Sequence, residues 1–298
     1  MNEKTSSKGS RRDKIFKILF IIITTTSIIS VALIAWFIFS NGLPAIGKVG
    51  VKEFLFGKQW APTHKPPKFG ILPMILGSIY VTLGSVIIGV PIGLLAAIYM
   101  AFYCPKKIYP ILKGGINLLA GIPSVVYGLF ALENIVPLVR DNFGGFGLSM
   151  LSAIVLLALM ILPTVIGLSE ASLRAVPKYY YEGAIALGAT HERAIYSVVV
   201  PRARSGIMAS VIMAIGRSIG ETMAVKMIAG NSPIIPSALT DKVRTLTTNI
   251  VLEMGYAQGL HREMLISTGV VLFIFILIIN LIFSRFNRKR KLEAEDDE

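Results

Sequence analysis

Long apolar runs with almost no charged residue alternate with short polar segments along the chain. In windows of about 19 residues, such runs stand out at about 15–40, 71–101, 111–132, 148–169, 206–230 and 265–283. An α-helix rises about 1.5 Å per residue, so each run is long enough to cross about 30 Å of hydrocarbon. Backbone N–H and C=O groups have no water partner there, which makes helices the expected form. The pattern predicts an all-α, polytopic membrane protein with six transmembrane helices.

The composition agrees with a membrane location and excludes the soluble classes. Of the 298 residues, 54% are hydrophobic and 16% are charged, and the mean hydropathy is +0.68. Soluble domains carry about 25% charged residues, so a water-soluble enzyme is excluded. The formal net charge of +13 raises the question of nucleic-acid binding. The basic residues, however, border the apolar runs without interleaved aromatic residues, so they indicate anchors at span ends, and no nucleic-acid partner is predicted.

Positive charge is distributed unequally between the two sides of the predicted bundle. Six spans place both termini on one side, and 19 of the 30 Lys and Arg residues fall there. Nine fall on the other side, five of them in the lysine-rich segment 41–70, and the remaining two, Arg217 and Lys226, lie inside the fifth run. The positive-inside rule therefore predicts that both termini are cytoplasmic.

This orientation divides the chain into successive parts. The first apolar run is too long for a signal peptide and no A-x-A-like cleavage site follows Ser40, so it is predicted to be a retained helix. The predicted parts are a cytoplasmic tail at 1–14, the first transmembrane helix at 15–40, an extracytoplasmic loop at 41–70, a membrane core at 71–283 and a cytoplasmic tail at 284–298. The single cysteine, Cys104, excludes an intramolecular disulfide.

The longest internal cytoplasmic segment, residues 171–205, is called the elbow below. Its sequence predicts two short helices that meet at Gly188, the first over Tyr179–Leu187 and the second from a Thr190 cap to Val199. Pro201 is expected to open the return to the membrane. From these residues alone, the elbow is either an amphipathic segment lying on the membrane surface or a compact docking element with an exposed face.

The elbow resembles the EAA motif of ABC importer permeases. Glu182, Gly183 and Ala184 stand at the start of the motif, Gly188 follows six residues after the glutamate, and Val198, Val200 and Pro201 match its end without a gap. Gly183 replaces the first alanine of the motif, and the two valines replace isoleucine and leucine. The resemblance implies the type I permease fold, and it implies that the elbow is a coupling helix that docks into a separate ATP-hydrolysing subunit.

Further segments are similar to the phosphate ABC importer permeases, PstC-type subunit. These segments are Gly121–Val125, Leu173–Pro177, Gly216–Val225 and Gly230–Asn231, and the similarity extends over about 70–285. Lys226 departs from the small or uncharged residue expected at its position. The resemblance implies a bacterial inner-membrane permease that forms a heterodimer with a second homologous permease subunit. It also implies two ATP-binding subunits and an extracytoplasmic phosphate-binding protein as partners.

The fifth run contains Arg217, Glu221 and Lys226, which are the ionisable residues farthest inside any apolar run. Residues 217 and 221 are i and i+4, so one helical face is expected to carry both. A charge at the bilayer centre costs about 2.5–3.5 kcal/mol on insertion scales, so the pair needs a reason. Either the two charges neutralise each other and pin neighbouring helices, or they line an aqueous path.

For the second alternative, the planar fork of Arg217 suits phosphate oxygens, and Glu221 beside it would keep anion binding weak enough for release. In the family that the chain resembles, this arginine and glutamate are linked to transport, which favours Arg217 and Glu221 as a substrate pathway. Lys226 is expected to snorkel toward the interface.

Signals of catalysis are missing from the sequence. The string Gly42–Val49 approaches a P-loop but lacks the Ser or Thr that would hold Mg²⁺, and His64, His191 and His261 all lie in predicted loops. No catalytic residue, metal site or cofactor is predicted. Two hypotheses remain: one half of an ATP-driven importer pore, for phosphate or another oxyanion, or an autonomous proton- or ion-coupled anion carrier that uses Arg217 and Glu221. The elbow favours the importer, since a carrier has no use for it.

Overall fold

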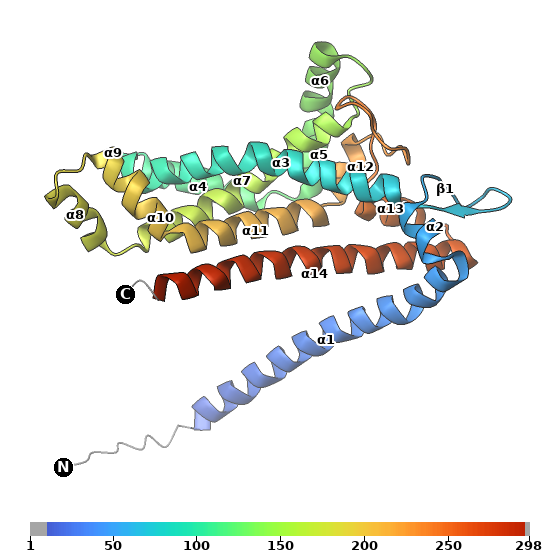
Figure 1. The fold of residues 1–298 in the computed structure, drawn as a ribbon, viewed down its shortest axis with the longest axis horizontal. Helices are drawn as coiled ribbons and strands as arrows, with labels where there is room; N and C mark the ends of the chain where they lie inside the picture. The colour runs from blue at the N-terminus through green and yellow to red at the C-terminus, as the bar shows by residue number, and fades with distance from the viewer. Residues whose placement is uncertain (1–10, 296–298) are drawn as a thin grey trace.

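The computed structural model describes residues 11–295, with side chains for 14–282 and 285, and is almost entirely helical (Figure 1). The first half of this region contains α1 (Arg11–Val49), α2 (Val51–Phe56), β1 (Trp60–Ala61), β2 (Lys68–Phe69), α3 (Leu72–Ile98), η1 (Tyr99–Tyr103), α4 (Tyr109–Gly121), α5 (Ser124–Phe130), η2 (Ala131–Ile135) and α6 (Val136–Phe143). The second half contains α7 (Met150–Arg174), α8 (Lys178–Ala186), α9 (His191–Ala194), η3 (Ile195–Val199), α10 (Val200–Arg202), α11 (Arg204–Gly220), α12 (Met223–Ile228), α13 (Leu246–Glu253) and α14 (Gly259–Glu295). The elements labelled η are short π-helices that continue an adjacent α-helix.

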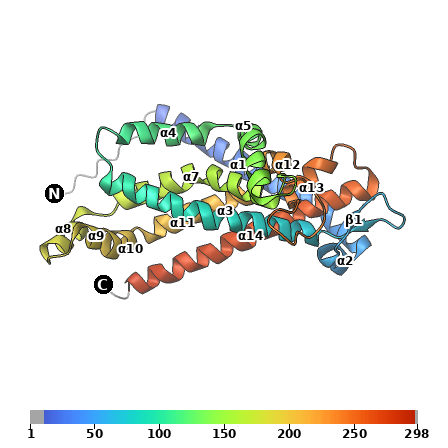
Figure 2. The same ribbon diagram turned by 90° about the horizontal axis from the view of Figure 1, so that it is seen from above.

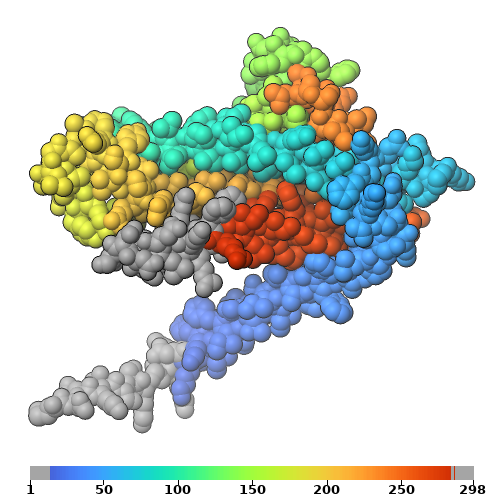
Figure 3. Space-filling view, in the orientation of Figure 1, coloured from blue at the N-terminus to red at the C-terminus, as the bar shows by residue number. Residues whose placement is uncertain are grey.

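Two ends of the bundle serve as landmarks. The elbow, with α8, α9 and α10, lies at one end, called the elbow end; the antiparallel β1–β2 hairpin, α2 and α13 lie at the other, called the hairpin end (Figures 1 and 2). Helices α3 and α7 both start near the hairpin end and finish near the elbow end, whereas α11 returns from the elbow end. Helix α1 meets α14 at the hairpin end and diverges from it toward the other end (Figures 1 and 3).

Helices α3, α7 and α11 form the packed centre because small residues let them approach closely. A Cβ atom added to Gly84 or Gly89 of α3 would lie 2.6–2.7 Å from the side chains of Ile154 or Ile161 of α7. One face of α11 is also small and packs inside the chain: Ser210 is hydrogen-bonded to Ser169 of α7 at 2.9 Å, and a Cβ on Gly206 would collide with Ser172. Small residues at regular spacing are the usual means of close helix packing in membranes.

The six predicted spans are represented by four long helices and two bent helix pairs. Helices long and apolar enough to cross a membrane cover 14–49, 72–103, 150–174 and 259–282, and the described residues contain six spans if each bent pair counts as one. The predicted all-α, polytopic class is confirmed. The predicted loop at 41–70 starts later, because α1 continues to Val49 through Pro44.

The third predicted run, 111–132, is not one continuous helix. Helix α4 ends at Gly121, α5 starts at Ser124, and the chain bends by 99° between α4 and the helical stretch 124–143. The reason lies in Pro123, whose ring disfavours helical backbone at the preceding residue; Ile122 accordingly has φ −67° and ψ 127°. Helix α4 alone, with its 13 residues, is about 20 Å long and too short to span the hydrocarbon.

The elbow follows its sequence closely with one exception. Helix α8 replaces the predicted helix over Tyr179–Leu187 with bounds shifted by one residue, Gly188 has φ +85°, and the Thr190 side chain accepts from Arg193 N–H at 3.3 Å. The sequence predicts that the return to the membrane opens at Pro201, whereas the chain turns at Ala203. Pro201 lies near the end of the continuous helical stretch 191–202, directly after η3, and the chain bends by 67° between this stretch and α11.

The two predicted tails are only partly within the described region. Residues 1–10 and 296–298 lie outside it, so the predicted N-terminal tail at 1–14 is described only for its last residues, which begin α1. The segment predicted as a C-terminal tail from residue 284 continues α14 as far as Glu295.

Candidate functional site

Arg217 lies in the last turn of α11 and is half-buried. Among the side chains that the structure describes, its guanidinium has no hydrogen-bond or ion-pair partner. The C-terminal end of a helix carries partial negative charge, which favours a cation at this position. A half-buried arginine without a partner among the described residues has all its donors available for another group.

The predicted placement of Arg217 and Glu221 on one helical face is wrong. Helix α11 ends at Gly220, and Glu221 has extended backbone, with φ −68° and ψ 130°. Its carboxylate turns to the following helix: Glu221 Oε1 accepts from the backbone N–H groups of Thr222 and Ala224, each at 3.1 Å. The carboxylate therefore caps the start of α12, and no ion pair between Arg217 and Glu221 occurs among the described residues.

Two further hydrogen bonds, one of them from α13, stabilise the break after Gly220. Thr247 of α13 donates to the carbonyl oxygen of Glu221 at 3.1 Å, and Thr222 Oγ1 donates to that of Gly220 at 3.1 Å. These bonds satisfy backbone groups that the end of a helix leaves unpaired. The sequence contains no proline here, so the break depends on side-chain donors and acceptors that a hydropathy pattern does not register.

Two faces of α11 differ in their surroundings near Arg217. Ser218 is buried and its hydroxyl is hydrogen-bonded to Ser85 of α3 at 2.8 Å, so this face belongs to the packed centre. Gly216 and Gly220 are exposed, and a Cβ atom added to either would meet nothing within 4 Å in the described residues. The exposed glycine face is thus open to another molecule at close range.

Lys226 lies on α12, one turn beyond the break, and is half-buried. Its ammonium group has no recorded partner within the described region, so the expectation that it snorkels stays a prediction. Its carbonyl oxygen accepts from Asn231 Nδ2 at 2.6 Å. Asn231 has φ +54° and its buried Oδ1 is without a hydrogen-bond partner among the described atoms.

The elbow residues predicted to contact an ATPase are presented on the surface. Glu182, Gly183, Gly188 and Pro201 are exposed, and Ala184 is half-buried. Behind this surface, Tyr181 is hydrogen-bonded to His191 Nδ1 at 2.8 Å, which ties α8 to α9. A cavity of about 450 Å³ lies between the elbow and the ends of η1 and α7. Helix α11 starts next to the elbow and, at 17 residues, is about 25 Å long. The structure therefore keeps the elbow residues and Arg217 at opposite ends of α11 rather than in one site.

Two buried carboxylates were not predicted from the sequence. The first is Glu170 near the end of α7, whose side chain is 2% exposed. It accepts from Tyr109 Oη at 2.6 Å, from Lys113 Nζ at 2.6 Å and from Arg174 Nε at 2.8 Å. These four residues are called the Glu170 cluster.

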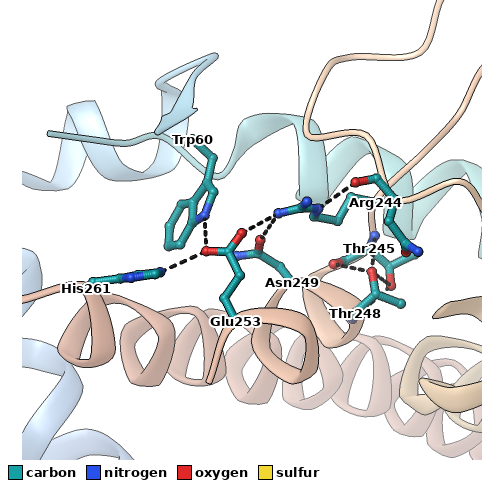
Figure 4. Close-up of polar contacts among 8 residues, drawn as sticks. Trp60, Arg244, Thr245, Thr248, Asn249, Glu253 and His261 are labelled. Atoms are coloured by element: carbon teal, nitrogen blue, oxygen red, sulfur yellow. Dashed lines mark hydrogen bonds and ion pairs between the residues drawn. The ribbon is translucent and has the colours of Figure 1, made fainter. Parts of the chain in front are cut away.

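The second buried carboxylate, Glu253, organises the hairpin end (Figure 4). Its Oε1 accepts from Arg244 Nη1 at 2.6 Å, and its Oε2 accepts from Trp60 Nε1 and faces His261 Nε2, both at 2.8 Å. Arg244 also donates to Asn249 Oδ1 at 3.1 Å. These five residues, the Glu253 cluster, join β1, the loop before α13, α13 and α14.

The loop that leads into α13 is closed by a third carboxylate. The backbone N–H groups of Ser237 and Ala238 and the Ser237 hydroxyl donate to Asp241 Oδ2 at 2.8–2.9 Å, and the backbone bonds lower the pKa of Asp241 most strongly. The ionised form of Asp241 is therefore the form that holds this turn.

Replacing Glu253 with glutamine is expected to destabilise the protein strongly. Glu253 and Arg244 are 9% and 14% exposed, and removing one partner of a buried ion pair costs about 3–5 kcal/mol. The matched control is Glu263→Gln, because Glu263 pairs with Lys48 where both are exposed and such pairs contribute about 0–1 kcal/mol. Thermal unfolding in detergent should give a clearly lower midpoint for the first variant alone. Equal midpoints would contradict a structural role for the cluster.

Solved structures of ABC importers share this arrangement of helices. The chain superposes on the bacterial alginate ABC transporter in complex with an alginate pentasaccharide-bound periplasmic protein with a TM-score of 0.67, at 15% identity, over 93% of this chain and 96% of that one. It superposes on the inward-facing MetNI methionine ABC transporter with a TM-score of 0.60, at 20% identity, over 74% and 95%. These similarities define the class of fold, which is the type I permease fold of ABC importers.

The sequence gives the family. Residues 89–292 match the family described as binding-protein-dependent transport system inner membrane component, and the chain belongs to this family. It is 38% identical to the probable ABC transporter permease protein YqgH of Bacillus subtilis, over 89% of each chain. It is 32% identical to a probable phosphate transport system permease protein PstC of Methanocaldococcus jannaschii, over 90% of this chain and 91% of that one. It is 31% identical to the phosphate transport system permease protein PstC of Mesorhizobium japonicum, over 81% and 80%.

Membership in this family establishes a multi-pass inner-membrane permease subunit that works with an ATPase and a substrate-binding protein.

Proposed function

We propose that this chain is one of two membrane-spanning subunits of an ATP-driven phosphate importer, with Arg217 in the substrate pathway and the elbow as the docking element for the ATPase. The observation that carries the proposal is the unpaired, half-buried guanidinium of Arg217 at one end of α11, with an exposed elbow at the other. An arginine fork donates two parallel hydrogen bonds to a tetrahedral oxyanion, which suits phosphate. Relatives named as phosphate transport permeases support the same cargo.

Glu221 has a positioning role in this proposal in addition to the effect of its charge near the path. Its carboxylate accepts from two backbone N–H groups of the α12 start, which fixes the break directly after the Arg217 turn. A fixed break holds the last turn of α11 at the edge of the path, so Glu221 positions the arginine. It also places a negative charge near the anion, which favours release of the cargo.

The elbow end is assigned to the cytoplasm and the hairpin end to the opposite side. Both termini then lie in the cytoplasm, as the excess of Lys and Arg on that side indicates. This orientation puts Glu182, Gly183, Ala184, Gly188 and Pro201 where a cytoplasmic ATPase can reach them. It puts the hairpin end toward an extracytoplasmic phosphate-binding protein.

The second homologous permease subunit is expected to cover the exposed glycine face of α11. Gly216 and Gly220 leave space for a close approach by another helix, and a path lined by one chain alone would leave Arg217 facing lipid. The proposed assembly therefore contains this chain, a second homologous permease subunit, two ATP-binding subunits and the phosphate-binding protein.

Reconstitution of the complete assembly in liposomes tests the cargo. With ATP inside and the loaded binding protein outside, labelled phosphate should accumulate, and a tenfold excess of sulfate or molybdate should leave its uptake unchanged. Preferential uptake of another oxyanion would reassign the cargo. Liposomes that hold this chain alone should not accumulate phosphate under a proton gradient, and accumulation there would favour the autonomous carrier.

A further inference from the structure

Helix α4 is attached to the rest of the molecule along one narrow face. None of its 13 residues is buried, although all are described, and it packs chiefly against α7. The half-buried side chains that turn toward α7 are those of Tyr109, Lys113 and Ile116, spaced as one helical face. The attachment therefore depends on very few contacts, and two of these three side chains are polar.

Both polar side chains bind the same carboxylate. Tyr109 Oη and Lys113 Nζ donate to Glu170 of α7, each at 2.6 Å, while the carboxylate itself is 2% exposed. A carboxylate so deeply buried has to be compensated by charge and hydrogen bonds, and here Lys113 and Arg174 supply the positive charges. Hydrogen bonds to ionised groups are the strong and directional class, so they fix the position of α4 on α7 more tightly than apolar contacts of this size.

The same cluster is joined to the start of the elbow. Arg174, the last residue of α7, donates from Nε to Glu170 and from Nη2 to the Met100 carbonyl oxygen at 2.7 Å. Its guanidinium also lies over the Tyr109 ring, 4.6 Å from the centroid. Helix α8 begins at Lys178, only four residues after Arg174. A displacement of the elbow thus acts directly on a residue that holds Glu170.

At its other end, α4 is joined to the neighbourhood of Arg217. Tyr127 of α5 is buried, and its hydroxyl donates to the Leu119 carbonyl oxygen of α4 at 2.9 Å, which bridges the break at Pro123. Tyr127 also packs in the same buried cluster as Ala224 of α12, whose N–H donates to the Glu221 carboxylate at the break that follows the Arg217 turn. Helix α4 therefore connects the elbow end to the wall of the path on the side of Tyr127.

We propose that Glu170 is a positioning residue that carries the movement of the elbow into α4, and through α4 and Tyr127 to the region around Arg217. The proposal rests on the function proposed above. It assigns to the elbow a second route into the membrane besides α11, which leaves the elbow directly. Without the Glu170 carboxylate, α8 still moves with the ATPase, but α4 no longer follows.

Distances between spin labels test this in the complete transporter. With Cys104 replaced by serine, one pair of labels at Leu118 of α4 and Ile87 of α3 reports on α4, and a second pair at Leu187 and Ile87 reports on the elbow; all three side chains are exposed. In the parent protein, ATP is expected to change both distances. In Glu170→Gln, the elbow distance should still change, whereas the α4 distance should not. A change of the α4 distance in Glu170→Gln, or no change of it in the parent, would overturn the proposal.

Transport measurements add a functional readout. Glu170→Gln should lower the phosphate taken up per ATP hydrolysed by about tenfold, a factor within the usual range for energetic coupling between two distant sites of a protein. Lys113→Met should have the same effect and Lys113→Arg should restore coupling, so the test does not depend on one variant being stable. The control is Glu263→Gln, the same change in an exposed pair at the hairpin end. Uptake per ATP unchanged in both Glu170→Gln and Lys113→Met would overturn the proposal. If the parent takes up a different anion, the proposed cargo fails, while the label distances still test Glu170.

Discussion

Replacing Arg217 with leucine is expected to lower phosphate uptake by the assembled transporter about 10–150-fold. The substitution removes hydrogen bonds from a charged donor, and this range corresponds to the net loss of one such bond, which contributes about 1.5–3 kcal/mol. The free energy of unfolding should change little in the destabilising direction, because the Arg217 guanidinium has no partner among the described side chains and leucine is cheaper to place in an apolar bundle. The measurement is the initial rate of labelled phosphate uptake into proteoliposomes, with ATP hydrolysis recorded in parallel.

Two further variants separate the charge of Arg217 from its shape. Arg217→Lys keeps the charge and loses the planar fork, so an intermediate rate is expected if bidentate contact with phosphate matters. Arg140→Leu removes an arginine that is exposed and paired with Asp141, and it should transport at the parent rate. Normal transport rates in both Arg217→Leu and Arg140→Leu would show that Arg217 is not part of the pathway.

The sequence was sufficient to predict an all-α, polytopic chain and the places of its apolar segments, because hydrophobic length is a property of single segments. It was not sufficient to predict where a span is broken. Pro123 carried a local signal for the break after α4, and the 99° bend follows from it. The break after Gly220 carried no such signal, since it depends on Glu221 binding the N–H groups of Thr222 and Ala224 and on a hydroxyl donated from Thr247.

The same limit explains why the charged pair was misplaced. The i, i+4 spacing of Arg217 and Glu221 brings two side chains together only while the helix continues through both residues. Glu221 itself ends that continuity by capping α12, so the residue that suggested an ion pair is the residue that prevents one. The prediction that Arg217 lines the substrate pathway does not depend on this pairing, because an arginine inside an apolar run needs a reason whatever its neighbours do.

The buried carboxylates were missed for a different reason. Glu170 stands at the flank of an apolar run, where an exposed carboxylate is the ordinary expectation. Its burial depends on Tyr109 and Lys113, which are 61 and 57 residues away in the chain. The sequence does contain a signal: Tyr109 and Lys113 stand at i and i+4 on the mostly apolar α4, which indicates a polar partner inside the bundle.

Replacing Gly188 with glutamate is expected to uncouple ATP hydrolysis from uptake while the protein still inserts. Gly188 has φ +85°, where side-chain-bearing residues pay about 1–2 kcal/mol, and its N–H and that of Ala189 close the end of α8 on the carbonyls of Ile185 and Ala184. A glutamate there strains this turn and adds a negative charge to the exposed elbow surface that also carries Glu182. Uptake per ATP hydrolysed should fall about tenfold, measured in the same proteoliposomes.

Gly188→Asn is the matched variant, because asparagine tolerates the left-handed conformation and adds no charge. A Cβ atom at residue 188 would meet nothing within 4 Å in the described residues, so neither substitution is limited by space inside this chain. Parent-like coupling in Gly188→Asn beside loss in Gly188→Glu would place the defect at the surface that faces the ATPase. Loss in both variants would instead show that the geometry of the turn itself tolerates no side chain once the ATPase is docked. Parent-like uptake per ATP in Gly188→Glu would contradict a role of the elbow in coupling. In that case the elbow could not transmit ATPase movement to α11 or to the Glu170 cluster.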